Sequence, residues 1–260
     1  MSKEHINYLK KIKRTNLVIK LIQILIIITI ISIWQYAADK GYINTFISSS
    51  PKNVLKTIIN LYKNKTLFHH IWITLYEIII SFIIGEAVGI IVAAFLWRYN
   101  FIFKILDPFL TILNSMPKVS LGPIIIILAG ASTKSIIIMA LFISIIITII
   151  DMHQAFKETD KNKIRLMQSF KANKNQIFFK LIFPSNFNNL INTAKVNLGL
   201  VFIGVIMGEF LVSKAGIGYL IMYGSQVFNL NLVMTGIILL IILAAIMHYI
   251  IVFIERKLKF

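Results

Sequence analysis

The chain has 260 residues, of which 58% are hydrophobic, and its formal net charge is +17. Its mean hydropathy of +0.82 is far too high for a globular chain of this length, so the composition excludes a protein whose only solvent is water. The same charge on a soluble protein would suggest nucleic acid, but here the basic residues can be placed relative to a membrane, and we expect no nucleic-acid partner.

Apolar runs long enough to cross a bilayer recur six times along the sequence. A hydrocarbon core of about 30 Å needs roughly 20 mostly apolar residues in a helix. The runs cover residues 17–36, 71–97, 109–129, 135–150, 190–211 and 232–254, of which the fourth is short and the third is interrupted by Pro117 and Pro123. We therefore predict an all-α, polytopic membrane helix bundle with about six transmembrane helices. It forms a single domain, residues 1–260, and is a multi-pass protein of the cell membrane.

A basic tail, residues 1–16, precedes the first run. This run is too long for the apolar core of a secretory signal peptide, although Tyr36-Ala37-Ala38 resembles a cleavage site. If the N-terminus is inside, 17 Lys and Arg residues fall in the cytoplasmic segments and seven fall in the opposite loops. This positive-inside bias predicts that both termini are cytoplasmic.

Between the first two runs, residues 48–66 predict a short helix on the outer face. Ser50 can cap this helix with Pro51 at its first position, and apolar residues follow at helical spacing. We interpret the segment as an interfacial helix that covers the outer ends of the spans. Contact with the transported solute is the alternative.

Small residues in two spans predict close helix packing. Gly85 and Gly89 lie four residues apart in the second span, and Gly204 and Gly208 do so in the fifth. Because lipid gives helices no hydrophobic reason to associate, small residues at this spacing favour close approach of two backbones. They indicate a packed bundle and do not select a function.

Three carboxylates lie within or near the ends of spans: Glu77, Glu86 and Glu209. At membrane depth a carboxylate is costly unless it faces a partner or water, so each is a candidate site residue, with a position near a span end or a local hydrogen bond as the alternative. Glu77 and Glu86 are nine residues apart and point to opposite sides of a helix, so they do not form a paired acid site. The adjacent His69 and His70 point apart, and we expect no metal site there.

The sequence contains no catalytic or nucleotide-binding motif that we can identify. It has no glycine-rich phosphate loop ending in Gly-Lys-Ser or Gly-Lys-Thr, and no Ser, His and Asp arrangement stands out. We therefore expect a protein that is not an enzyme, with no catalytic residues and no cofactor. If ATP drives it, another chain must bind the nucleotide.

The longest segment on the inner side covers residues 152–189. It is basic, yet apolar residues recur in it at roughly helical spacing, namely Ile164, Leu166, Met167, Phe170, Ile177, Phe178 and Leu181. This pattern predicts two short amphipathic helices whose exposed apolar stripe is a docking surface. The alternative is a solvated basic loop attracted to anionic lipid headgroups.

At this point the chain resembles the permease subunits of ATP-binding-cassette (ABC) importers, in the branch that carries aliphatic sulfonates, taurine, nitrate and pyrimidine precursors. Four stretches carry the resemblance in the expected order and span most of the chain. They are the small-residue second span, Asn114-Ser115-Met116-Pro117-Lys118 with Leu121-Gly122-Pro123, the central loop ending in Pro184, and Gly208-Glu209-Phe210 followed by Gly216-Ile217-Gly218-Tyr219-Leu220.

In that family the central loop, here residues 152–189, carries a coupling motif that docks into a groove on the ATPase. Setting Pro184 as the motif proline leaves a similar tail, but Arg165 stands where the family has Glu and Lys171 where it has Gly. A side chain at the glycine position costs about 1 kcal/mol or more if the backbone needs a positive φ. The departures imply an ATPase specific to this permease, or weakened coupling. The resemblance assigns coupling to Arg165, Ser169, Lys171, Ala172, Ile177, Phe178, Leu181 and Pro184.

The resemblance also implies a translocation path or gate at Glu209, Gly216, Gly218, Pro117 and Pro123. A purely structural role for Glu209 and the two glycines is the alternative.

For the assembly, the resemblance implies an importer of a small solute, such as an anionic sulfonate or a pyrimidine. The partners would be ABC ATPase subunits, an extracellular substrate-binding protein and a second permease copy, all at the lipid bilayer. The rivals are a gradient-driven secondary transporter or channel, and a membrane-embedded enzyme. The first would show a carboxylate relay or an internal repeat and the second clustered His, Asp or Glu, and we find neither pattern.

Overall fold

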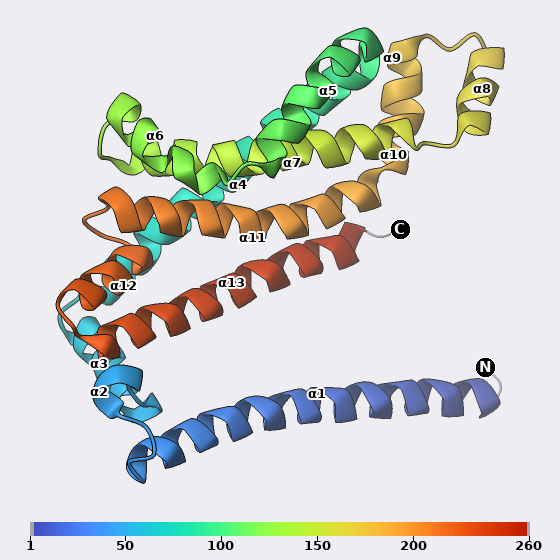
Figure 1. The fold of residues 1–260 in the computed structure, drawn as a ribbon. Helices are drawn as coiled ribbons and strands as arrows, with labels where there is room; N and C mark the ends of the chain where they lie inside the picture. Colours follow the sequence, from blue (N-terminus) through green and yellow to red (C-terminus); the bar gives the residue numbers. More distant parts are fainter. Residues whose placement is uncertain (1–2, 259–260) are drawn as a thin grey trace.

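The computed structural model describes residues 3–258, which form helices and turns only. The long helices are α1 (Lys3–Asp39), α4 (Leu67–Arg98), α7 (Thr133–Lys157), α11 (Phe187–Val212) and α13 (Leu230–Leu258) (Figure 1). The shorter elements are α2 (Thr45–Ser48), α3 (Pro51–Lys63), α5 (Asn100–Ser115), η1 (Lys118–Leu121), α6 (Gly122–Ala129), α8 (Lys161–Ser169), α9 (Lys174–Ile177), the π-helical turn η2 (Phe178–Ile182), α10 (Phe183–Ser185) and α12 (Ile217–Gln226).

The number of spans agrees with the hydropathy pattern. Five helices are long and apolar enough to cross a membrane, and a pair of shorter helices bent by 90° provides a sixth candidate. This confirms the predicted all-α, polytopic bundle with about six crossings. The basic segment at the N-terminus continues into the first span, because α1 is one helix from Lys3 to Asp39.

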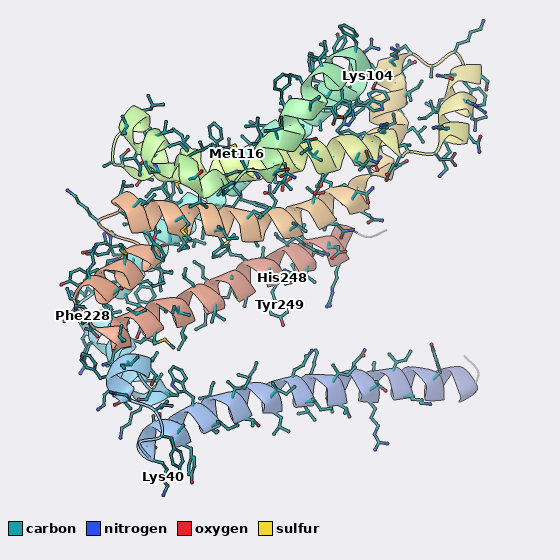
Figure 2. All side chains as sticks on the ribbon, viewed as in Figure 1. Lys40, Lys104, Met116, Phe228, His248 and Tyr249 are labelled. Atoms are coloured by element: carbon teal, nitrogen blue, oxygen red, sulfur yellow. The ribbon has the colours of Figure 1, made fainter. Side chains whose placement is uncertain are left out.

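The third predicted span, residues 109–129, in which the sequence shows interruptions at Pro117 and Pro123, is a bent pair of helices. The helix α5 begins earlier, at Asn100, and ends at Ser115, and the chain then bends sharply before α6. Met116 has extended backbone angles because it precedes Pro117, whose ring disfavours a helical conformation in the residue before it. Figure 2 labels Met116 at this corner.

The fourth predicted span, residues 135–150, is too short. The helix α7 continues to Lys157, and α5 packs against it at His153. His153 is buried there, and its ring stacks on Phe103 with centroids 3.6 Å apart. The inner segment therefore leaves the bundle after Lys157 rather than at Met152.

The short helix between the first two spans forms where the sequence predicts it. The Ser50 side chain caps α3 by accepting a hydrogen bond from Asn53 N (3.3 Å), and Pro51 occupies the first position. Val54 is buried, and α3 packs against α13. The helix thus covers one end of the bundle, and its place relative to the bilayer surface stays a prediction.

The core lies where α4, α7 and α11 pack together. A Cβ atom on Gly204 would lie 2.6 Å from the Ala140 Cα atom, so α11 and α7 touch backbone to backbone. Gly85 and Gly89 on α4 face Ser144 and Thr148 on α7, and Gly208 on α11 faces Ile136. Apolar side chains fill the spaces between these contacts, among them Ile78, Ile136, Leu198, Val201, Val205 and Leu239.

The helix α1 stands apart from the rest of the bundle (Figure 1). No residue in the most apolar stretch of α1 is buried. Near its end, α1 contacts α3. The N-terminal end of α1 and the C-terminal end of α13 lie at the same end of the molecule as α8 and α9 (Figure 1). The helices α3 and α12 lie at the opposite end.

Candidate functional site

The N-terminus of α12 is held by side chains from α4. The chain turns into this helix at Gly216, whose φ of +119° is in a region that strongly favours glycine. Gly216 N donates a hydrogen bond to His70 Nδ1 (3.1 Å), and Ile217 N donates to Thr74 Oγ1 (2.7 Å). Because the first amides of a helix have no partner within the helix, these two side chains satisfy groups that would otherwise be orphaned.

Glu209 on α11 supplies the remaining acceptors at this helix end. Its Oε2 atom accepts from Gly218 N (2.5 Å) and Tyr219 N (3.3 Å), and its Oε1 atom accepts from the Thr74 hydroxyl (2.6 Å). A carboxylate at a helix N-terminus is also favoured by the helix dipole. A Cβ atom on Gly218 would lie 2.7 Å from Oε2, so only glycine allows this approach. In this conformation Glu209 is buried and joins α4, α11 and α12, and its role as a gate stays a prediction.

Glu77 is the second carboxyl group at this end of the bundle. It is completely buried one turn from Thr74, and neither of its oxygens has a hydrogen-bond partner. Its carboxyl group lies close enough to that of Glu209 for the two to interact. A buried carboxyl without a donor is costly, so Glu77 destabilises this conformation. This position is buried within the bundle.

Glu86 belongs to a separate polar cluster within the bundle. Asn197 Nδ2 on α11 donates to Glu86 Oε1 (2.8 Å) on α4 and to Thr148 Oγ1 (2.9 Å) on α7. Interhelical hydrogen bonds of this kind stabilise helix association in lipid. Glu86 thus makes a local hydrogen bond, which was the structural alternative for this residue in the sequence analysis.

The two prolines predicted at the path lie on the bend between α5 and α6. Pro117 follows the corner at Met116, and Pro123 occupies the first turn of α6. Between them, a Cβ atom on Gly122 would lie 2.8 Å from Leu211 Cδ1, so this bend packs against the end of α11. The structure brings together Glu209, Gly216 and Gly218, and it places the prolines on a different segment.

At the other end of the molecule the chain forms a helical hairpin, α8 to α10. Asp160 caps α8 by accepting from Asn162 N (2.8 Å), and Asn173 and Gln176 form a reciprocal capping box at the start of α9. Lys171 lies in the turn between these helices with a φ of +59°. The backbone at the family's glycine position therefore needs the left-handed conformation that glycine adopts without strain.

The apolar residues of the hairpin face two ways, which corrects the single exposed stripe predicted from the sequence. Ile177 and Phe178 are buried against the bundle, and the Phe178 ring lies 5.3 Å from both Trp97 on α4 and Phe156 on α7. Leu166 is 58% exposed and Phe170 is 73% exposed. Of the remaining predicted coupling residues, the exposed ones are Arg165, Ser169, Lys171 and Pro184, and the half-buried ones are Ala172 and Leu181.

Replacing Lys171 with glycine should stabilise this turn by about 1 kcal/mol, because glycine adopts a positive φ without a Cβ penalty. We expect amide hydrogen exchange in α8 and α9 to slow several-fold. Lys65→Gly is the matched control, since Lys65 has the same φ of +59° at the opposite end of the molecule, and it should leave hairpin exchange unchanged. Faster exchange in Lys171→Gly would contradict the strain argument.

Several residues of these clusters were missed by the sequence analysis. His70 and Thr74 hold α12, and Asn197 joins three helices, yet none was a candidate. One signal was present, since His70, Thr74, Glu77 and Ser81 recur at helical spacing within an apolar span. Within residues 3–258, no group of three or more His, Cys, Asp or Glu side chains is arranged to hold a metal ion.

Comparisons with known proteins agree with this architecture. The family model described as "Binding-protein-dependent transport system inner membrane component" matches residues 85–260. The Bacillus subtilis permease SsuC, named for the transport of aliphatic sulfonates, is 25% identical over 88% of this chain and 83% of its own length. The formylaminopyrimidine transport permease ThiX of Halalkalibacterium halodurans is 23% identical over 72% of this chain and 74% of its own length.

A solved structure also has this fold. A chain from inward-facing crystals of the MetNI methionine ABC transporter superposes with a TM-score of 0.67 at 18% sequence identity. The superposition covers 76% of this chain and 98% of the other. At this level of identity the likeness establishes the fold.

Proposed function

This chain belongs to the family of binding-protein-dependent transport system inner membrane components, the permease subunits of ABC importers, and we propose that it couples ATP hydrolysis by a separate ATPase to alternating access for a small solute. The hairpin α8 to α10 would be the cytoplasmic element that docks the ATPase. The gradient-driven transporter that the sequence left open loses its support once the family is established.

The observation that carries this proposal is the two-sided hairpin. One side is fixed to α4 and α7 through Phe178, so a force applied to the hairpin reaches the bundle. The other side exposes Leu166 and Phe170. An anchored element that also presents apolar side chains has the properties of an interface between a moving partner and a rigid helix bundle.

The helix α4 offers a route from this interface to the opposite end of the protein. It has 32 residues, which corresponds to a rod roughly 48 Å long. Trp97 near its end contacts Phe178 of the hairpin, and Thr74 near its start holds the first amide of α12. We propose that ATP-driven movement of the hairpin tilts α4 as a rigid body and moves α12, so that the gate predicted at Glu209, Gly216 and Gly218 changes state.

The remaining parts of the assembly follow the family. We propose that a second copy of the permease forms the path near a two-fold axis, that two ATPase subunits dock on the cytoplasmic side, and that an extracellular binding protein delivers the solute. The positive-inside bias supports placing the hairpin and both termini in the cytoplasm. Relatives named for aliphatic sulfonates and for formylaminopyrimidine support a small sulfonate, taurine, nitrate or pyrimidine-like solute.

Co-purification tests this proposal. The tagged full-length protein, extracted in mild detergent from its own host, should retain an ABC ATPase that mass spectrometry identifies. Phe170→Asp should lose most of that ATPase while the permease stays folded, because this side chain is 73% exposed. Phe46→Asp is the matched control, since Phe46 is 67% exposed and belongs to α2, which lies at the other end of the molecule (Figure 1). If the parent retains no ATPase while a control importer stays intact, a gradient-driven transporter becomes the leading function.

A further inference from the structure

The exposed side of the hairpin is strongly basic. Residues 161–180 contain six Lys and Arg residues and no Asp or Glu. In the part of the chain that the structure describes, the ion pair between side chains joins Lys195 on α11 to Glu255 on α13, and neither residue belongs to the hairpin. The bases of the hairpin therefore have no acidic partner within residues 3–258.

The charges and the apolar side chains share one face of α8. Residues four apart lie above one another on a helix, so Leu166 and Phe170 form one row and Lys161 and Arg165 form the neighbouring row. Ile164 and Met167 point the other way and pack against the buried cluster around Phe178. The exposed face, which we call the hairpin surface, consists of Lys161, Arg165, Leu166, Phe170 and Lys171.

We infer that the hairpin surface selects an ATPase whose docking groove is apolar at its centre and acidic at its rim. This inference rests on the proposed function and specifies the chemistry of the partner. Leu166 and Phe170 would enter the apolar centre, where burial of their side chains provides most of the binding energy. Arg165, Lys161 and Lys171 would face Asp or Glu side chains, which speed docking and exclude an ATPase whose groove carries bases.

The geometry favours a protein partner over a lipid surface. Anionic headgroups would attract the bases but do not require a fixed hairpin. Here the hairpin is held by the Asp160 cap, by the capping box of Asn173 and Gln176 and by the buried Phe178. Asn186 Nδ2 also donates to Thr159 Oγ1 (2.7 Å), which ties the end of the hairpin to the loop after α7. A surface held this rigidly matches a preformed groove, because little conformational freedom is lost on docking.

Charge reversal and cross-linking test the inference on the tagged full-length protein from its own host. Arg165→Glu should lower the ATPase recovered per permease about tenfold, which corresponds to about 1.4 kcal/mol. Arg165→Lys should retain most of it. Lys56→Glu is the matched control, with the same charge change on the exposed side of α3. A zero-length carbodiimide reagent should join Lys161, Lys163 or Lys171 to Asp or Glu residues of the ATPase.

Each outcome bears on a different statement. If Arg165→Glu retains as much ATPase as the parent and no carboxyl cross-links form, the acidic rim is wrong while the proposed function stands. The acidic rim is also wrong if Arg165→Glu retains the ATPase but no longer binds vesicles of phosphatidylcholine with phosphatidylglycerol. In that case the basic residues bind anionic lipid. If even the parent retains no ATPase while a control importer does, both the inference and the proposed function are wrong.

Discussion

Replacing Glu209 with glutamine should lower the free energy of unfolding by about 2 to 3 kcal/mol and abolish most solute uptake. The Glu209 carboxylate accepts hydrogen bonds from Gly218 N, Tyr219 N and the Thr74 hydroxyl. A glutamine offers one acceptor oxygen where the carboxylate offers two, so one buried donor loses its partner. The negative charge at the N-terminus of α12 is lost as well.

Glu77 provides the matched comparison, because the same substitution should have the opposite effect there. Both Glu77 oxygens are buried without a donor, and its carboxyl group interacts with that of Glu209. In Glu77→Gln the buried carboxyl group is removed, and the amide can donate a hydrogen bond toward Glu209. We therefore expect the free energy of unfolding to stay constant or rise.

Both variants are measured by unfolding in detergent and by uptake into cells. The pair of results separates a general intolerance of change in this buried cluster from a specific cap on α12. If Glu77→Gln destabilises the protein as much as Glu209→Gln does, the donors that we assign to Glu209 are not what holds α12. If both variants retain full stability, the cap contributes little.

The membrane spans were largely predictable, because hydropathy depends on local composition. The hydropathy pattern could not predict how tertiary contacts change the positions where the spans end. Asp151 and His153 look like the start of a loop, yet α7 continues through them, with Asp151 exposed and His153 buried against Phe103 of α5. The bend at Pro117, by contrast, had a local cause that the sequence displayed, since a residue before proline avoids the helical conformation.

The candidate site was predictable only in part for a similar reason. Glu209 and the following glycines stand close together in the chain and form one visible stretch. Their partners His70 and Thr74 lie more than 130 residues away, and only the packing of α4 against α11 and α12 brings them there. The sequence predicted strain at Lys171 if its φ is positive, and its φ is +59°.

The hairpin gave the least reliable prediction, because amphipathic spacing shows which residues share a face but not what covers that face. Ile177 and Phe178 have the same hydrophobicity as Leu166 and Phe170. The first two are buried in the bundle by the turn η2, and the other two are exposed. A test of docking must therefore use the exposed residues, and substitution of the buried ones tests the anchor.

The anchor leads to the second large expected effect. Replacing Phe178 with aspartate should lower the free energy of unfolding by about 4 kcal/mol or more, because it removes a buried ring and leaves a charge among Trp97, Phe156 and Phe183. The adjacent Phe179 is the matched control, since it is 70% exposed where Phe178 is 9% exposed. Phe179→Asp should unfold at nearly the parent temperature.

The two variants also separate anchoring from docking if ATPase activity is measured in the assembled complex. In Phe178→Asp the hairpin loses the ring contacts that join it to Trp97 on α4 and Phe156 on α7, so any ATPase that still binds should hydrolyse ATP without driving uptake. Loss of uptake with retained hydrolysis would identify the Phe178 cluster as the joint that transmits movement. If Phe178→Asp keeps parental stability and uptake, the hairpin moves the bundle by another contact, and α4 is not the rod that connects it to α12.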